Sequence, residues 1–508
     1  MTKLHNLIVL IFITALSAVA QSKKAVVYSE KYRPQFHFSP KAHWMNDPNG
    51  MVYVNGTYHL YFQYNPTANV PGNIHWGHAT SKDLFHWKEK PIALYPDSLG
   101  LVFSGSAVLD KHNTSGLGTL VHPPMVALYA SHSVSKEKMG KTDVETQSLA
   151  YSNDAGLTWK KYKGNPVIKN MGDRDFRDPK VIWYEPQKKW VMVLAAHDHI
   201  DFFASKNLIT WIKESDFGRE AGDHAGVWEC PDLFELQNGN KKQWVLIVNM
   251  NPGGPNGGSA TQYFVGGFDG QKFTTYDKET KWLNYGPDNY AGVTWSNTGS
   301  RKIFLGWMSN WLYGDKVPTS PWRGAMTTSV NLALKEVNQK TYLVSEPVKE
   351  LQAITSIPKF LNNISFEHTY NIQSKLPSFG NKFIFKLKDV SVADFSIVLF
   401  NKNSEQLKIG YDKAKNIYYI NRDHAGITAF QKDFIKLSTA PRLSASPKIN
   451  LTLIVDETSA ELFADDGLTN MTGIFFSTSP MTGLNMYTPG KLNIGSLSYA
   501  KIGSVWGK

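Results

Sequence analysis

Short runs of apolar, β-branched and aromatic residues, each followed by polar residues, dominate the hydrophobic pattern and predict β-strands. Five of these runs resemble one another and recur at intervals of roughly 60 residues. They are Tyr58–Gln63, Val126–Ser131, Trp190–Ala195, Trp244–Asn249 and Ile303–Met308. Strand repeats of this length without amphipathic helices are typical of a β-propeller with four strands in each blade. The pattern therefore predicts an all-β chain that contains five blades.

A second repeat follows three of these runs, as a polar turn that leads into a Trp-ended strand. Its copies are Ser81–Trp87, Ser152–Trp159 and Ser205–Trp211. After the fifth unit the pattern changes to short strands without these echoes, such as Phe383–Leu387 and Ile417–Ile420. This change predicts a separate C-terminal β-sandwich. We place the propeller at residues 30–345, a linker at 346–358 and the sandwich at 359–508.

The N-terminus has the pattern of a secretory signal. Lys3 precedes the mostly apolar run Leu7–Leu16, and Ala18-Val19-Ala20 offers a small-x-small cleavage site. We expect residues 1–20 to be removed and the mature chain to be secreted or periplasmic. The run is shorter than the roughly 20 apolar residues of a membrane-spanning helix, and no later stretch reaches that length. We therefore expect no membrane partner.

The net charge of +11 raises the question of an anionic partner, but it arises from scattered lysines. Pairs such as Lys188-Lys189 and Lys241-Lys242 form no basic run, which favours a solvated surface over nucleic-acid binding.

Cys230 is the only cysteine, so no intramolecular disulfide can form. The hydrophobic core must supply the stability. The chain is expected to be a monomer or a weak homo-oligomer.

Three acidic motifs stand out against the strands: Trp44–Gly50, Phe176–Pro179 and Trp228–Asp232. Each places a carboxylate beside an aromatic residue, Pro or Gly, in a region predicted as a loop or strand end. A β scaffold directs acids from such positions into one cleft. Two carboxylates can form the pair that cleaves a glycosidic bond, and a third can hold the sugar. The motifs together therefore suggest a carbohydrate-cleaving site.

These motifs and five others carry a family resemblance. From about Pro34 to Leu351, in the right order, the chain resembles glycoside hydrolase family 32, which contains invertases, inulinases and levanases. The resemblance rests on Trp44–Gly50, Phe62–Pro66, His75–Ala79, Phe103–Ser106, Arg177–Pro179, Glu229–Asp232, Tyr285–Asp288 and Gly306–Trp311. It implies a five-bladed propeller followed by a β-sandwich, which agrees with the repeat count.

The resemblance implies that Asp47 is the nucleophile, Glu229 the acid/base and Asp178 the acid that accepts hydrogen bonds from sugar hydroxyls. Two close carboxyl groups do not readily ionise together, so we expect Glu229 to be protonated and Asp47 to stay charged with the help of neighbouring donors. Arg177 either balances this negative charge or forms a plain structural ion pair.

We expect a small polar pocket with an aromatic wall around these acids. The candidate hydrogen-bonding residues are Asn46, Gln63 and Ser104, the candidate apolar faces are Trp44, Trp76, Phe103 and Trp311, and Asp288 is placed on the leaving-group side. Trp159, which belongs to the second repeat, is assigned to packing between strands.

No metal or other cofactor is expected. His75 with His78, and His197 with Asp198 and His199, have metal-ligand spacing, but no thiolate or carboxylate set completes a site. The sequence predicts a secreted, retaining, exo-acting β-fructosidase that acts on sucrose, inulin, levan and fructo-oligosaccharides. The alternatives are a fructosyltransferase with a sugar acceptor and a non-catalytic fructan-binding propeller.

Overall fold

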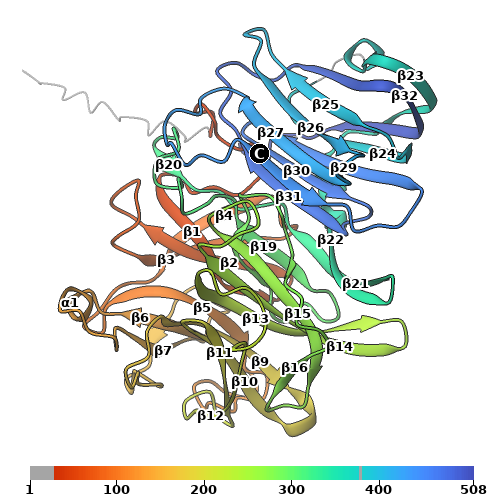
Figure 1. Ribbon diagram of the computed structural model, residues 1–508. Coiled ribbons are helices and arrows are strands. Elements are labelled where there is room, and N and C mark those ends of the chain that lie inside the picture. Colours follow the sequence, from red (N-terminus) through yellow and green to blue (C-terminus); the bar gives the residue numbers. More distant parts are fainter. Residues whose placement is uncertain (1–27, 377–379, 508) are drawn as a thin grey trace, which may run out of the picture.

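The computed structural model describes residues 28–376 and 380–507, and most of their regular structure is β-strand. The predicted signal segment lies outside these residues. A ring of five sheets forms the lower part of Figure 1, and a C-terminal β domain lies above it. The predicted fold class, a five-bladed propeller followed by a β-sandwich, is confirmed. None of the helices in the described part of the chain has the length and apolar character that a membrane crossing requires.

Each propeller blade is an antiparallel sheet whose strands follow one another in sequence. The first two blades consist of β1 (His43–Val54), β2 (Thr57–Asn65), β3 (His75–Ser81) and β4 (Trp87–Leu94), then β5 (Leu101–Leu109), β6 (Met125–His132), β7 (Glu145–Ser152) and β8 (Lys160–Lys161). The third consists of β9 (Phe176–Tyr184), β10 (Lys189–Ala196), β11 (His199–Ser205) and β12 (Ile212–Phe217). A short α-helix, α1 (Val134–Lys138), lies between β6 and β7.

The fourth blade consists of β13 (Val227–Asn238), β14 (Lys241–Asn251), β15 (Ala260–Phe268), β16 (Phe273–Thr275) and β17 (Lys281–Trp282). The fifth consists of β18 (Tyr290–Thr294), β19 (Ile303–Trp307), β21 (Val330–Val337) and β22 (Lys340–Pro347). β20 (Trp322–Arg323), from the fifth unit, pairs in parallel with β1 and so joins the last unit to the first blade. The first strands of the blades, β1, β5, β9, β13 and β18, contact one another around the axis.

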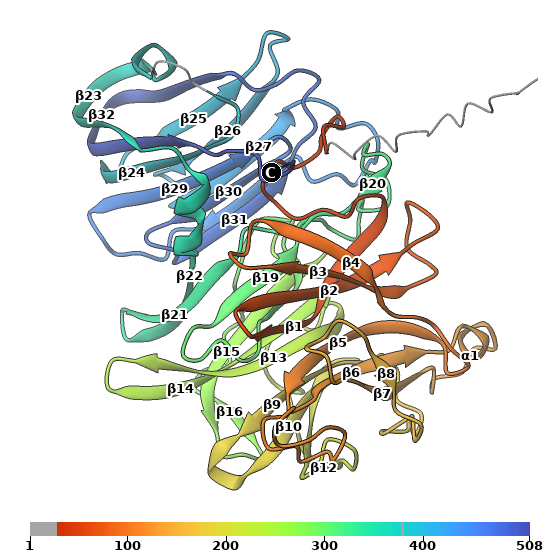
Figure 2. The same cartoon turned by 180° about the vertical axis from the view of Figure 1, so that it is seen from behind.

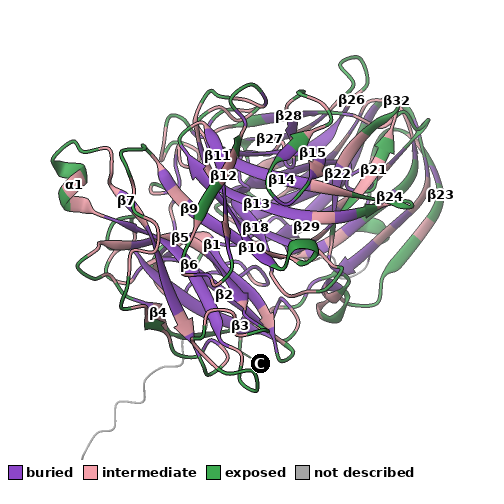
Figure 3. Cartoon of the chain, turned by 90° about the horizontal axis from the view of Figure 1, so that it is seen from below, coloured by how far each residue is buried: buried purple, intermediate pink, exposed green. Residues whose placement is uncertain are grey.

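The five predicted repeats coincide with the second strand of each blade: β2, β6, β10, β14 and β19. These strands read as nearly continuous apolar runs because both faces of a blade pack against neighbouring blades. Figure 3 shows the interiors of β2, β6, β10 and β14 as buried and α1 as largely exposed. The Trp of the second repeat precedes or begins the fourth strand instead of ending it. In two copies its indole N–H donates to the turn, from Trp87 to Leu84 O (3.0 Å) and from Trp211 to Leu208 O (2.9 Å).

The C-terminal domain has two layers that share one long strand (Figure 2). One layer contains β25 (Phe395–Phe400), β26 (Gln406–Asp412), β27 (Ile417–His424) and β28 (Leu437–Pro441). The other contains β24 (Phe383–Ser391), β29 (Lys448–Asp456), β30 (Ser459–Ala464) and β31 (Thr469–Ile474). The 19-residue strand β32 (Gly483–Lys501) pairs with β25 near its start and with β24 near its end, and β23 (Lys359–Asn371) runs along it. The 3₁₀ helices are η1 (Glu185–Gln187), η2 (Lys349–Ile354), which precedes β23, and η3 (Gln373–Lys375).

A buried histidine joins the two domains. His37 precedes β1, and its Nδ1 lies 2.9 Å from Asp456 Oδ2 while its Nε2 lies 2.9 Å from Glu461 Oε2. Burial alone would lower the pKa of His37, but the hydrogen bonds and charges of the two carboxylates outweigh it and raise the pKa to about 9. His37 is therefore a cation between the domains at neutral pH.

We expect this contact to make stability depend on alkaline pH. A protonated His37 stabilises the fold fully below its unfolded pKa of 6.5, and this contribution, about 3 kcal/mol, is lost as the pH rises through 9. His37→Gln should therefore melt well below the wild type at pH 7, and the difference should shrink towards pH 10. His86→Gln, which removes a partly exposed hydrogen bond with Asp83, is the control with a small effect. A constant difference between wild type and His37→Gln from pH 7 to 10 would contradict this reading.

Candidate active site

A cavity of about 720 Å³ lies at one end of the propeller axis and contains the three predicted carboxylates. Four blades contribute first-strand residues to it: Asn46 and Asp47 from β1, Phe103 and Ser104 from β5, Arg177 and Asp178 from β9, and Glu229 from β13. The structure thus brings together residues that are far apart in the sequence. The acids lie near the starts of first strands and not in loops.

The strand pairing explains why these side chains face the axis. Each of the five first strands has a break in register with the second strand, which is a β-bulge, close to this end. In each blade a residue at the bulge is followed by Pro or Gly: Asp47-Pro48, Ser104-Gly105, Asp178-Pro179, Cys230-Pro231 and Ala291-Gly292. Pro has no N–H to donate, so it fits where the ladder is interrupted. A bulge bends the strand and redirects a side chain, here towards the axis.

Asp47 is held by donors on both carboxylate oxygens. Asn46 Nδ2 donates to Oδ1 and Ser104 Oγ donates to Oδ2, each over 2.8 Å. Burial, followed by the charge of Glu229, raises the pKa of Asp47 to about 6, although these donors act in the opposite direction. The donors therefore oppose the effect of burial, and a pKa of about 6 leaves Asp47 charged at neutral pH.

Asp178 and Cys230 pack against Asp47. The backbone N–H of Cys230 donates to Asp178 Oδ2 over 3.0 Å, and its Sγ lies 3.4 Å from the same oxygen and 3.7 Å from Asp47 Oδ2. Burial raises the pKa of Asp178, and the neighbouring carboxylates raise it further against the opposing effect of Arg177. Burial and the same carboxylates raise the pKa of the Cys230 thiol well above its usual value. Cys230 is therefore a neutral S–H donor between two acids.

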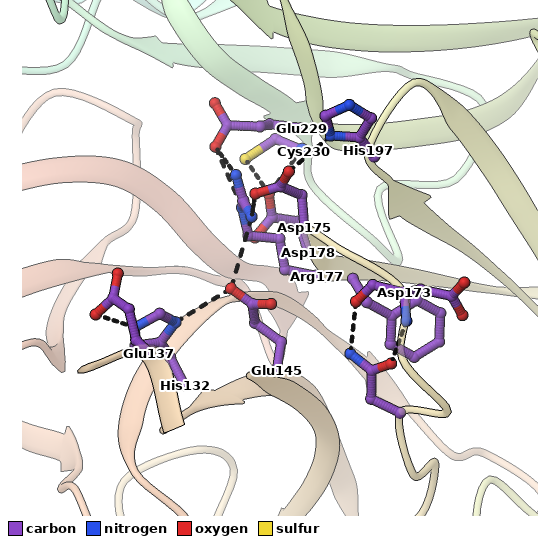
Figure 4. Close-up of polar contacts among 12 residues, drawn as sticks. His132, Glu137, Glu145, Asp173, Asp175, Arg177, Asp178, His197, Glu229 and Cys230 are labelled. Carbon is purple, nitrogen blue, oxygen red and sulfur yellow. Dashed lines mark hydrogen bonds and ion pairs between the residues drawn. The ribbon is translucent and has the colours of Figure 1, made fainter. Parts of the chain in front are cut away.

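Glu229 is held by a cation and a phenol. Arg177 donates to Glu229 Oε1 from NH2 over 2.9 Å and from Nε over 3.2 Å. The hydroxyl of Tyr290, in the fifth blade, donates to Glu229 Oε2. Arg177 NH1 also donates to Asp175 Oδ1 over 2.6 Å. Arg177 thus binds the expected acid/base residue directly and is shared with a further acid (Figure 4).

Five of the predicted sugar-binding residues line the cavity together with Arg177: Asn46, Gln63, Phe103, Ser104 and Trp311. Two predicted aromatic faces do not. Trp44 is fully buried, where it stacks on Trp311 and donates its N–H to Asn46 Oδ1 over 2.7 Å. Trp76 is also fully buried, packs in the same core cluster as Trp159 and donates to Phe103 O over 3.0 Å. Both support residues of the cavity wall from behind.

Asp288 does not reach the leaving-group side of the cavity, contrary to the sequence expectation. It is fully buried at the interface with the C-terminal domain. Its carboxylate accepts from Arg422 NH1 over 2.6 Å, from Tyr313 OH over 2.7 Å and from the backbone N–H of Ile474 over 2.9 Å. These three donors explain the burial of this charge. Its role is therefore structural.

The sequence did not identify several groups at the site: His132, Glu137, Glu145, Asp175 and Tyr290. The alternating charges in Asp173-Arg174-Asp175-Phe176-Arg177-Asp178 were a signal for Asp175. The others come from three strands and from α1 and have no local signature. No three of the His, Cys, Asp and Glu side chains in residues 28–376 and 380–507 are grouped as metal ligands.

Comparisons with known proteins agree with this geometry. The model of the glycosyl hydrolases family 32 N-terminal domain matches residues 37–347, and that of the family 32 C terminal matches residues 347–501. A levanase from Bacillus subtilis (strain 168) is 44% identical over 515 residues, which cover 98% of this chain and 75% of the levanase. An extracellular exo-inulinase from Aspergillus niger is 39% identical over 511 residues, which cover 93% of this chain and 95% of that protein.

Solved structures of related proteins share this fold over nearly their whole length. An exo-inulinase from Aspergillus awamori has a TM-score of 0.86 at 37% identity, with 94% of this chain and 100% of that chain covered. A β-fructofuranosidase from Schwanniomyces occidentalis, complexed with fructosyl-erythritol, has a TM-score of 0.86 at 32% identity over 94% of this chain and 99% of that one. The matches cover the propeller and the β-sandwich together, and on this evidence the chain belongs to glycosyl hydrolase family 32.

Proposed function

We propose that this chain is an exo-acting β-fructofuranosidase that hydrolyses terminal β-D-fructofuranosyl residues of sucrose and fructans with retention of configuration. The observation that carries the proposal is the confinement of Asp47, Asp178 and Glu229, each with its own donors, in one cavity. The relatives named levanase, exo-inulinase and invertase support the same substrate class. A cavity that ends at the propeller axis accommodates the terminal sugar of a fructan better than an internal one.

In the proposed mechanism Asp47 attacks the anomeric carbon while Glu229 gives its proton to the leaving oxygen. Asn46 and Ser104 fix the attacking carboxylate, and Arg177 and Tyr290 fix Glu229. Asp178 forms hydrogen bonds with hydroxyls of the fructosyl ring. Glu229, now ionised, takes a proton from water, which attacks the fructosyl-enzyme and restores Asp47.

We also propose that the chain is exported and that residues 1–20 are removed. The charged start, the apolar run and the small residues before Gln21 support this proposal. The exo-inulinase relatives are named as extracellular proteins. N-terminal sequencing of the protein recovered from the medium or periplasm tests the cleavage site.

Asp47→Asn and Glu229→Gln should each remove one chemical role while they preserve shape. We expect kcat/KM on sucrose to fall about 10⁴-fold for Asp47→Asn and at least about 100-fold for Glu229→Gln. Released fructose measures both. The matched control is Glu235→Gln on the same strand as Glu229, in an exposed ion pair with Lys242, which should stay within twofold of the wild type. Full activity of either site variant would overturn the assignment.

Thermal melting separates lost chemistry from lost folding. The pKa of Asp47 is raised from 3.8 to about 6 in the folded protein. The protonated carboxyl group at low pH therefore fits the buried site, whereas the ionised group lowers the free energy of unfolding as the pH rises through 6. Asp47→Asn should thus melt above the wild type at pH 8 by the equivalent of about 3 kcal/mol, and the gain should disappear near pH 4.

The stereochemistry of the first product tests the double displacement. Two inversions at the anomeric carbon leave fructose initially as the β anomer. Proton NMR at early times should show this anomer before mutarotation, with sucrose as substrate. An initial α anomer would show a single displacement by water and would overturn the nucleophilic role of Asp47.

Ser104→Ala should shift the pH profile. The wild-type kcat/KM should fall as the pH drops through about 6, where Asp47 takes up its proton. Without the hydroxyl of Ser104 the charged carboxylate is less stable, so the acid limb should move about one unit to higher pH. Ser131→Ala is the control, because that hydroxyl bonds Ser148 and no site carboxylate. An acid limb that stays in place in Ser104→Ala would show that Asp47 does not set it.

A further inference from the structure

A row of alternating charges leads from Glu229 to the rim of the cavity (Figure 4). Arg177 contacts Glu229 on one side, and its NH1 lies 3.6 Å from Glu145 Oε1 on the other. The same Glu145 oxygen lies 3.1 Å from His132 Nδ1, and His132 Nε2 lies 3.2 Å from Glu137 Oε2 on α1. The proposed mechanism uses only the inner end of this row.

Both ring nitrogens of His132 face carboxylate oxygens, which accept hydrogen bonds and do not donate them when ionised. Two such contacts require a proton on each nitrogen and hence a charged imidazole. Burial would lower the pKa of His132, but the hydrogen bonds and charges of Glu145 and Glu137 outweigh it and raise the pKa. Glu145 on β7 and Glu137 on α1 are the charged groups that act on the ring, and Arg177 on β9 is the next charge beyond them.

His132 also supports the outer wall of the cavity. Its ring stacks on Phe103, with 4.2 Å between centroids and 11° between planes. Phe103, Val134 and Glu137 line the cavity together with His132. Ser133, directly after His132, caps the N-terminus of α1. One charged ring therefore fixes an aromatic face and a short helix.

We propose that His132 is a positioning residue that holds Phe103 and α1 as the binding wall for the leaving group, a sugar or fructan unit released next to Glu229. The proposal rests on the proposed function and adds to its site His132 and α1, which the sequence did not assign. The location follows from the row itself, since Glu229 protonates the leaving oxygen and the row runs from Glu229 to this wall. An aromatic face beside carboxylates suits the carbons and hydroxyls of a sugar.

The test compares a large leaving group with a small one. Sucrose releases glucose, which reaches the wall, whereas methyl β-D-fructofuranoside releases methanol, which does not. In His132→Gln we expect the ratio of the two KM values, sucrose over the methyl fructoside, to rise about five- to tenfold, the net size of one ordinary hydrogen bond. His132→Arg keeps the charge, two donors and a planar group for stacking, and should return the ratio towards the wild-type value.

The pH dependence supplies a second measurement. In the wild type the charged ring is present below its raised pKa and is lost as the pH increases, so the KM ratio should rise with pH. In His132→Gln the ratio should be high and independent of pH. Glu137→Gln, at a largely exposed position where folding is not at risk, should raise the ratio by a smaller factor. His86→Gln, in a His–Asp pair that does not line the cavity, should leave it unchanged.

An equal rise of KM for both substrates would indicate a general structural role and would overturn the proposal. So would a ratio within twofold of the wild type in both His132→Gln and Glu137→Gln. With an active wild-type enzyme these outcomes leave the proposed function intact. A wild type that hydrolyses neither substrate overturns the function and this proposal with it.

Discussion

The site depends on one constraint, which is that the first strands of all five blades are interrupted at the same end of the propeller axis. A bulge frees two backbone positions from the ladder, and the residue before Pro or Gly turns towards the axis. Asp47, Ser104, Asp178 and Cys230 occupy equivalent places in four blades, and Ala291 occupies the fifth. The ring geometry thus places side chains in contact that are as many as 183 residues apart in the sequence, as Asp47 and Cys230 are.

This convergence has an electrostatic consequence. Burial raises the pKa values of Asp47 and Asp178, and neighbouring carboxylates raise them further, since the cavity contains several carboxyl groups and the single guanidinium of Arg177. Arg177 could satisfy all of them only partly, and the structure directs it to Glu229, Asp175 and Glu145. Asp47 depends instead on neutral donors, namely Asn46 and Ser104. The carboxyl groups of Asp47 and Glu229 therefore differ in environment, which is the condition that the proposed mechanism sets for one to attack and the other to transfer protons.

The sequence predicted the parts of the fold that repeat. The second strands are apolar on both faces, so each of the five gave a strong local signal, and the motif acids reached the cavity as expected. The prediction was wrong for Trp44, Trp76 and Asp288, because proximity to a motif does not say which face of a strand meets the cavity and which meets the core. The His132 row was not predicted because its members come from β6, α1, β7 and β9, and no local pattern encodes the pairing of His132 with Glu145 across two strands or the contact of Glu145 with Arg177 across two blades.

The buried Asp288 links the C-terminal domain to the site, although that domain does not line the cavity. Arg422 from β27 and Tyr313 both bind Asp288, and Arg422 also donates to the hydroxyl of Tyr313 over 2.8 Å. Tyr313 belongs to the loop that carries Trp311, and the same loop is tied to the fourth blade by the N–H of Trp311, which donates to Ser259 Oγ over 3.1 Å. A buried ion pair of this kind gives little net stability but specifies geometry when all its partners are satisfied. The sandwich therefore fixes one wall of a cavity that it does not line, and this contact gives a physical reason for the two domains to act as one enzyme.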